Sequence, residues 1–251
     1  MKRNCTSLVG VFLLPTLVLS LACATPPPPA RETPDLSVIG IAASISAPLW
    51  GHTQAEYVYF VRLDESETYA YGDPILSNYT IGDYVYLFNA QPGRYAVIAA
   101  GYQRQSQSAP IGSSTSLGGG VSMSTSVTMT SNNTFMAYLP KTLIDKTVVT
   151  VGPAEVAFIG EIVLDKTSWE AADDVQLHYY HLLAPGHEDL NFLLKAFSGQ
   201  RHDAGIEHEL DQGQATRRRF LEHSQRKFAD ADWESIFENP VGSGPPPAEA
   251  K

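Results

Sequence analysis

Cysteine and basic residues are scarce in this chain. Only Cys5 and Cys23 occur among its 251 residues, so a framework of several disulfides is excluded. Lysine and arginine together number 17 against 27 aspartates and glutamates, which gives a net charge of −10. Nucleic acid attracts proteins with the opposite balance, and we therefore expect no nucleic-acid partner.

Catalytic motifs are also missing. The sequence contains no Gly-x-Ser-x-Gly elbow, phosphate-binding loop, dinucleotide fingerprint or His-Glu-x-x-His. We therefore expect neither enzymatic activity nor a cofactor. The apolar stretch Leu8–Ala22 has 15 residues and is interrupted by Pro15 and Ser20. Because a membrane-spanning helix needs about 20 apolar residues, this stretch predicts a cleaved export signal instead.

The end of this stretch is the most informative part of the chain. Lys2 and Arg3 supply the basic start of an export signal, and Leu19-Ser20-Leu21-Ala22-Cys23 closes it. The closing segment resembles the lipobox of bacterial lipoproteins, with a serine where an aliphatic residue is usual. The resemblance implies cleavage before Cys23, a lipid on its thiol, fatty acid such as palmitate on its new N-terminus, and a bilayer as partner. Ala24 follows where an aspartate would signal inner-membrane retention, so the resemblance implies the outer membrane, facing the periplasm.

A second cleavage site competes with the first. Ala22-Cys23-Ala24 also fits the small-x-small rule of ordinary secretion, with a cut after Ala24 and release of a soluble binding protein. Cys5 is lost with the signal under either cut, so Cys23 has no partner for an internal disulfide. This favours lipidation, and both cuts stay open.

Composition divides the chain into five parts. Residues 1–22 form the signal peptide, 23–36 the lipidated cysteine with a Pro-rich tether, 37–183 a β-sandwich domain, 184–240 a helical appendage and 241–251 a disordered tail. The consecutive prolines of the tether favour an extended polyproline form of about 3.1 Å per residue, which predicts a stand-off of about 37 Å between bilayer and domain.

Period-two alternation of apolar residues dominates the chain up to Leu164. It predicts a mainly β protein, an antiparallel β-sandwich of seven or eight strands with a C-terminal helical appendage. The expected strands are residues 39–45, 57–63, 84–88, 94–102, 121–129, 135–139, 147–151 and 156–164, with a further one at 175–182. Residues 103–120 predict a long polar loop, our first candidate for a contact surface.

Two short segments suggest a known type of module. Pro92-Gly93-Arg94-Tyr95-Ala96-Val97 resembles the Pro-Gly-x-Tyr-x-Val hairpin of prealbumin-like (transthyretin-type) modules. Residues 151–162 resemble a later strand pair of uncharacterised bacterial lipoproteins of that type. The resemblance covers residues 37–165 and implies a fold but no reaction.

Helical spacing replaces alternation towards the C-terminus. Apolar residues at i, i+3, i+4 and i+7 predict one amphipathic helix, and these are Leu190, Leu193, Leu194 and Phe197. A second helix is expected at residues 215–229, with Phe220, Leu221 and Phe228 buried. A short apolar face of Trp233, Ile236 and Phe237 follows it. We expect these helices to pack on the sheet, because short helices are not stable alone in water.

The nearest approach to a reactive site is a histidine-rich region. It comprises His178, His181, His187, His202 and His208, with Glu188, Asp203 and Glu207 nearby. Zinc needs three or four converging ligands, whereas His178 and His181, three apart on an expected strand, would point to opposite faces. We therefore expect solvated histidines and no metal. The alternative is a metal site with His178, His181 and His187 as ligands.

Arg217-Arg218-Arg219 is the one basic cluster, expected as a solvated helix face with lipid phosphates as the alternative partner. Together these features predict a membrane-anchored envelope lipoprotein that acts as a non-enzymatic binding or structural module in the periplasm. Its expected partners are the bilayer, through acylated Cys23, and an envelope protein or glycan. The alternatives are a metal-dependent hydrolase that uses the His178–His208 region and a secreted soluble binding protein.

Overall fold

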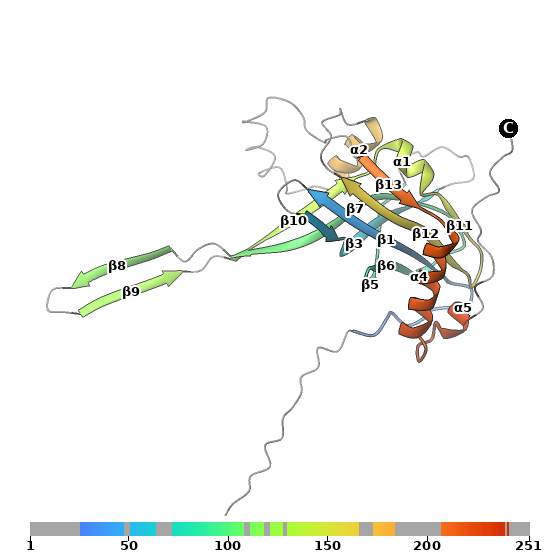
Figure 1. The fold of residues 1–251 in the computed structure, drawn as a ribbon, viewed down its shortest axis with the longest axis horizontal. Helices are drawn as coiled ribbons and strands as arrows, with labels where there is room; N and C mark the ends of the chain where they lie inside the picture. The colour runs from blue at the N-terminus through green and yellow to red at the C-terminus, as the bar shows by residue number, and fades with distance from the viewer. Residues whose placement is uncertain are drawn as a thin grey trace, which may run out of the picture.

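Two β-sheets and a pair of C-terminal helices form the body of the protein (Figure 1). The computed structural model describes residues 26–47, 51–63, 72–107, 111–117, 121–127, 130–165, 173–183, 207–238 and 240. Several predictions lie outside the described residues: the signal peptide, Cys23, the helix at 190–197, the tail at 241–251, His187 and His202.

The first sheet has six strands in the order β13-β12-β1-β6-β5, with β2 also paired to β1. These strands are β1 (Ser37–Ala47), β2 (Gly51–Gln54), β5 (Tyr79–Ile81), β6 (Tyr84–Ala90), β12 (Val156–Asp165) and β13 (Glu207–Asp211). Strands β1 and β12 run parallel, with Val38 opposite Val156, and all other pairings are antiparallel. The purely antiparallel sandwich is therefore wrong for this sheet, which is mixed. Parallel neighbours need a long connection, and here the second sheet lies within that connection.

The second sheet has five strands, all antiparallel, in the order β10-β7-β3-β4 with β11 also on β7. They are β3 (Tyr57–Leu63), β4 (Ile75–Leu76), β7 (Gly93–Gln107), β10 (Thr130–Tyr138) and β11 (Val149–Val151). The short helix α1 (Lys141–Lys146) joins β10 to β11. The long strand β7 therefore organises this sheet, because it pairs with three other strands.

The main core fills the space between the two sheets. Strand β1 contributes alternate side chains, Ile39, Ile41, Ala43 and Ile45, as the spacing predicts. Strand β3 contributes the fully buried Val58 and Phe60 from the other side. Complete burial of one large apolar side chain stabilises a fold by about 1.5–3 kcal/mol, so this layer is a principal source of stability.

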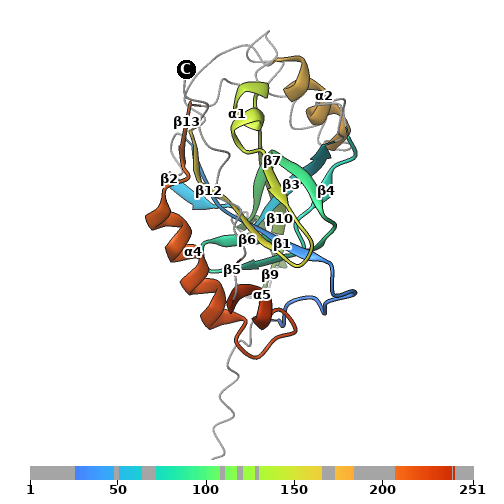
Figure 2. The same cartoon turned by 90° about the vertical axis from the view of Figure 1, so that its right-hand side faces the viewer.

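A second core covers the outer face of the six-stranded sheet. There, α4 (Gln214–Lys227) and α5 (Glu234–Glu238) pack on the sheet and make a third layer (Figure 2). We call this core the aromatic cluster, and its rings are Tyr79, Tyr84, Tyr86, Phe88, Phe158, Phe220, Phe228, Trp233 and Phe237. The helix expected at 215–229 is confirmed, with Phe220 and Phe228 buried and Leu221 half-buried.

Residues 175–182 form a helix, not the predicted strand. Helix α2 (Asp174–Leu183) begins with reciprocal bonds: the backbone N–H of Gln176 donates to the Asp173 carboxylate at 2.8 Å, and the N–H of Asp173 donates to Gln176 Oε1 at 3.1 Å. This capping box satisfies two backbone donors at the helix start. The apolar alternation of Val175, Leu177 and Tyr179 was misleading, because the cap determines the local structure.

The polar loop predicted at 103–120 is also wrong where the structure describes it. Strand β7 continues to Gln107, and β8 (Ile111–Leu117) pairs antiparallel with β9 (Val121–Val127), Ile111 opposite Val127. This hairpin extends away from the body of the protein (Figure 1). Serine and threonine make up more than half of both strands, and threonine is well suited to strands, so polar composition alone did not indicate a loop.

The turn at Pro92-Gly93 does not make the expected hairpin. Strands β6 and β7 lie in different sheets, so the turn carries the chain from one sheet to the other. The Tyr95 hydroxyl donates to the Gln91 carbonyl at 2.8 Å, and Arg62 Nη2 donates to the Pro92 carbonyl at 2.8 Å. These bonds hold the corner between the sheets in place.

Candidate functional site

A polar cleft opens where α4 lies beside the six-stranded sheet. It has a volume of about 290 Å³. The residues that line it come from four strands, one turn and one helix, and they are Ala42, Ala43, Ser44, Gln54, Asp83, Tyr84, Glu161, Ile162 and Arg219. Charged groups of both signs therefore meet in one cleft.

A β-bulge aims Glu161 into this cleft. The register between β1 and β12 shifts between Gly40 and Ala42, where Phe158 and Glu161 are the respective partners. Ile159 and Ile162 both face the main core, so the alternation breaks between them. Without the extra residue Glu161 would share the core face with Ile159, because side chains two apart on a strand point the same way.

Gly160 makes the bulge possible. Its φ of +138° is one that other residues rarely adopt. A Cβ at this position would lie 2.7 Å from the backbone oxygen of Asp211 on the neighbouring strand β13. A glycine inside an apolar strand is a recognisable sign of a bulge, and this was the one signal in the sequence that could have located Glu161.

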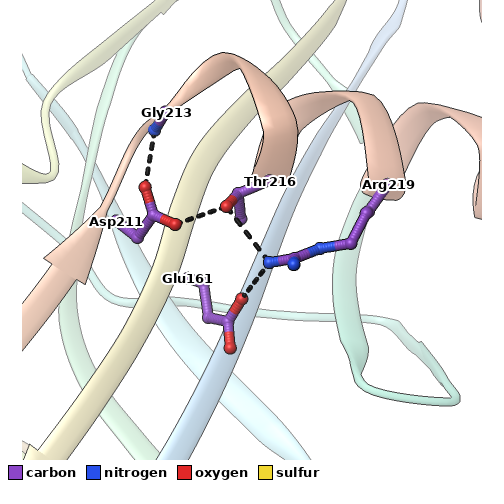
Figure 3. A network of polar contacts seen from close by, with 5 residues as sticks. All are labelled: Glu161, Asp211, Gly213, Thr216 and Arg219. Carbon is purple, nitrogen blue, oxygen red and sulfur yellow. Dashed lines mark hydrogen bonds and ion pairs between the residues drawn. The ribbon is translucent and has the colours of Figure 1, made fainter.

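A chain of polar contacts holds Arg219 against Glu161 (Figure 3). Arg219 Nη2 donates to Glu161 Oε2 at 3.0 Å and to the Thr216 hydroxyl at 3.1 Å, and the Thr216 hydroxyl donates to Asp211. Arg219 and Glu161 keep 62% and 47% of their side chains exposed, so a ligand can reach both. We expect this exposed ion pair to contribute little to stability.

Asp211 fixes the start of α4 and with it the position of Arg219. Its second carboxylate oxygen accepts the backbone N–H of Gly213 at 2.7 Å, at the N-terminus of the helix. The Thr216 hydroxyl and this N–H together lower the pKa of Asp211, so the carboxylate stays ionised. A negative charge at a helix N-terminus is favourable, because the helix dipole is positive there.

The opposite wall of the cleft is the turn between β5 and β6. Gln54 Nε2 donates to the Asp83 backbone oxygen at 2.5 Å, which ties this turn to β2. Burial raises the pKa of the Tyr84 phenol, and nearby Glu161 and Asp83 add to the rise while Arg219 opposes it. The phenol therefore remains a neutral hydrogen-bond donor. The ring centroids of Tyr84 and His223 lie 4.9 Å apart.

The arrangement suits a polar ligand. Two carboxylates and a guanidinium form charge-assisted hydrogen bonds, which are stronger than neutral ones, and the Tyr84 ring adds an apolar surface. Sequence reasoning did not assemble this site, because its residues are distant in the chain. Of its charged members, only Arg219 belonged to a cluster considered from the sequence. There, Arg218 pairs with Glu222 at 2.7 Å and is largely exposed, as expected, whereas Arg219 belongs to the cleft.

The histidine-rich region is only partly described. His178 and His181 lie on α2, where residues three apart share one side of the helix, so the expected opposite faces are wrong. His208 lies on β13, with its Nε2 3.2 Å from Lys146 Nζ. Within the described ranges, no group of three or more His, Cys, Asp or Glu residues is placed to hold a metal. His187, the third ligand of the alternative metal site, lies outside the described residues.

Helices of membrane-spanning length and hydropathy do not occur among the residues that the structure describes. Comparison with protein-family models, with curated proteins and with solved structures found no match to this chain.

Proposed function

We propose that this protein is a lipid-anchored module of a bacterial cell envelope that binds a polar envelope ligand, a glycan or a protein, without catalysing a reaction. The observation that carries the binding role is the cleft, where Glu161 and Arg219 are held in one geometry by β12 and α4 yet stay accessible. A site whose side chains are positioned before binding loses less entropy when the ligand arrives.

The anchor is supported by the sequence and by the course of the chain that follows it. The basic start, the apolar stretch and Cys23 fit a lipoprotein signal. Three residues after Cys23, the chain lies on the surface of the domain, where the Pro26 carbonyl accepts a hydrogen bond from Tyr79. Two or three acyl chains hold a protein durably on a membrane, and one does not. Attachment to the outer membrane, facing the periplasm, is part of this proposal.

A glycan is the favoured ligand, because Tyr84 places an aromatic ring beside the carboxylates and the guanidinium of the cleft. Binding of soluble peptidoglycan fragments and lipopolysaccharide core oligosaccharides to the purified protein would test this. We expect Arg219→Ala to weaken binding at least tenfold. Arg218→Ala is the matched control, because Arg218 is also an exposed, ion-paired arginine on α4 but does not line the cleft.

Equal losses in both variants, or no binding of either glycan class by the wild-type protein, would contradict the glycan assignment. A photo-reactive residue at position 83 that crosslinks in intact cells to one defined envelope protein would instead identify a protein ligand. The anchor is tested separately by labelling with palmitate, which we expect to be absent from Cys23→Ser while the cleft still binds its ligand.

A further inference from the structure

Residues 26–36 of the predicted tether are bound to the domain and do not form the free spacer that the sequence predicts. The Tyr79 hydroxyl donates to the Pro26 carbonyl at 2.9 Å, and Trp233 Nε1 donates to the Pro29 carbonyl at 2.7 Å. At its far end, Leu36 is buried in the aromatic cluster. The segment is therefore attached to the body along its length.

The spacing of these two bonds matches a polyproline helix. Such a helix has three residues per turn, and the bonded carbonyls belong to residues three apart, Pro26 and Pro29. Prolines have no N–H, so their carbonyls are the only backbone groups that a partner can bind. Aromatic grooves recognise proline-rich ligands in the same general way. The Tyr79 phenol and the Trp233 indole therefore bind carbonyl groups that lie one turn apart on a polyproline helix.

Asn89 and Arg31 complete the contact. Asn89 Nδ2 donates to the Ala30 carbonyl at 3.0 Å, and Asn89 Oδ1 accepts the Glu32 N–H at 3.1 Å. The Arg31 guanidinium carbon lies 5.5 Å from the centre of the Trp233 ring, within the range of a cation–π interaction. A backbone acceptor, the Ala30 carbonyl, and a backbone donor, the Glu32 N–H, are thus both bonded to Asn89 just after the prolines.

We infer that Tyr79, Asn89 and Trp233 form a recognition site for an extended proline-rich segment, the anchor clamp, which the chain's own Pro26–Ala30 occupies. The clamp also determines which face of the domain lies towards the membrane, and this second part rests on the lipid anchor proposed at Cys23. Cys23 is three residues before Pro26, a reach of at most about 11 Å. The anchored domain therefore lies with its α5 end at the bilayer and its α1 end away from it, since α5 and α1 are at opposite ends of the body (Figure 2).

The occupancy of the clamp can be measured without any lipid on the protein. The full-length chain with Cys5→Ser, Cys23→Ser and Ala30→Cys, synthesised without cells in detergent micelles, carries a single thiol at the exposed position 30, next to Pro29. A bimane fluorophore at position 30 reports proximity to Trp233 through quenching. We expect strong quenching that Tyr79→Phe with Asn89→Ala relieves at least twofold, because these changes release the segment and leave Trp233 in place.

Two controls make this measurement decisive. Trp233→Phe must also relieve the quenching, or else Trp50 or Trp169 is the quencher. A synthetic peptide with the sequence of residues 25–31 is expected to relieve it by competition. Equal fluorescence with and without Tyr79→Phe and Asn89→Ala, in protein with unchanged near-ultraviolet circular dichroism, would overturn the clamp. If the double variant does not fold, Tyr79→Phe alone is measured in its place. This change keeps the ring and its packing and removes only the hydrogen bond to Pro26.

The orientation is tested on the lipidated protein in vesicles that contain a headgroup-linked energy acceptor. Donor dyes on Glu234→Cys, on α5, and Lys141→Cys, on α1, are compared. We expect at least twofold greater transfer from position 234, and equal transfer from both positions after Tyr79→Phe with Asn89→Ala. Equal transfer in the unaltered clamp would refute the orientation. Failure of lipidation at Cys23 would remove the anchor and leave the micelle result for the clamp intact.

Discussion

The hydroxyl oxygens of Tyr86 and Ser224 lie 3.0 Å apart, with both side chains buried between the six-stranded sheet and α4. The Ser224 hydroxyl also donates to the Phe220 carbonyl at 2.9 Å, so the Tyr86 hydroxyl is the donor between the two. Burial raises the pKa of Tyr86, which keeps this donor neutral. One polar bond thus joins helix and sheet inside an aromatic layer.

Substitutions of these two residues should have unequal effects. Ser224→Ala leaves the Tyr86 hydroxyl buried without its partner, and we expect a loss of about 1–3 kcal/mol in the free energy of unfolding. Tyr86→Phe leaves Ser224 bonded to Phe220, and we expect a loss of only about 1 kcal/mol. Chemical denaturation measures both values. A larger loss in Tyr86→Phe would mean that the hydroxyl pair does not behave as described.

Gly40 on β1 lies directly against the ring of Phe220 on α4. A Cβ on residue 40 would lie 2.4 Å from the Phe220 ring, which is stacked on Phe158 with centroids 4.4 Å apart. Because neither ring can move freely, we expect Gly40→Ala to destabilise the fold by about 1–3 kcal/mol. Adding Phe220→Leu should recover part of that loss. Additive losses in this double-mutant cycle would argue against the steric contact.

Gly160→Ala tests whether the bulge builds the cleft. The substitution places a Cβ against the β13 backbone at a positive φ, and we expect a loss of about 1–3 kcal/mol in unfolding free energy. Ligand binding should weaken together with stability, because Glu161 moves with the bulge. Glu161→Gln serves as the control that weakens binding and leaves stability nearly unchanged. Normal ligand binding in folded Gly160→Ala would separate the bulge from the site.

Tyr57 should make the protein sensitive to alkali. Burial raises the pKa of Tyr57 to about 12, and its hydroxyl is buried without a hydrogen-bond partner among the described residues. The folded state therefore holds this proton more tightly than the unfolded state, and stability falls as the pH rises from 10 to 12. We expect Tyr57→Phe to lose less stability across this range and to unfold no more easily at pH 7. A steeper alkaline loss in Tyr57→Phe would contradict this account.

His223 should make the stability of the fold depend on pH in the acidic range. Burial lowers the pKa of His223, Lys227 and Arg226 lower it further, and Asp83 opposes them. Its pKa in the folded state lies below the value of about 6.5 in the unfolded chain, so its contribution is complete above pH 6.5 and is lost as the pH falls. Thermal unfolding between pH 5 and 7 should show a shallower decline for His223→Gln. Identical slopes for both proteins would show that His223 carries none of the pH dependence.

Local alternation predicted much of the sheet structure, and the strands at 39–45, 57–63 and 156–164 are confirmed. Strand β6 also shows why a third layer exists. Val85 and Leu87 enter the main core while Tyr86 and Phe88 enter the aromatic cluster, and a strand that is apolar on both faces needs a cover on both. The parallel pairing of β1 with β12 was not predictable, because no local pattern records which distant strands become neighbours.

The residues of the candidate cleft could not be grouped from the sequence, for the same reason. Asp83 lies in a turn, Glu161 follows a bulge and Arg219 lies on a helix, and only the tertiary fold brings them together. The Pro-rich segment shows a related limit. Its composition correctly excludes regular helix and strand, but only the positions of Tyr79 and Trp233 make it part of the domain surface.

The position of β1 determines the order in which the chain can fold. This strand lies between β6 and β12, and the backbone N–H of Glu155 donates to the Ser37 hydroxyl across 118 residues of chain. The pairing of β1 with β12 therefore cannot be completed until Asp165 has left the ribosome, and contacts over such sequence distances form slowly. Under the export that we propose, the chain would cross the membrane unfolded, and β1 would pair with β12 only on the far side.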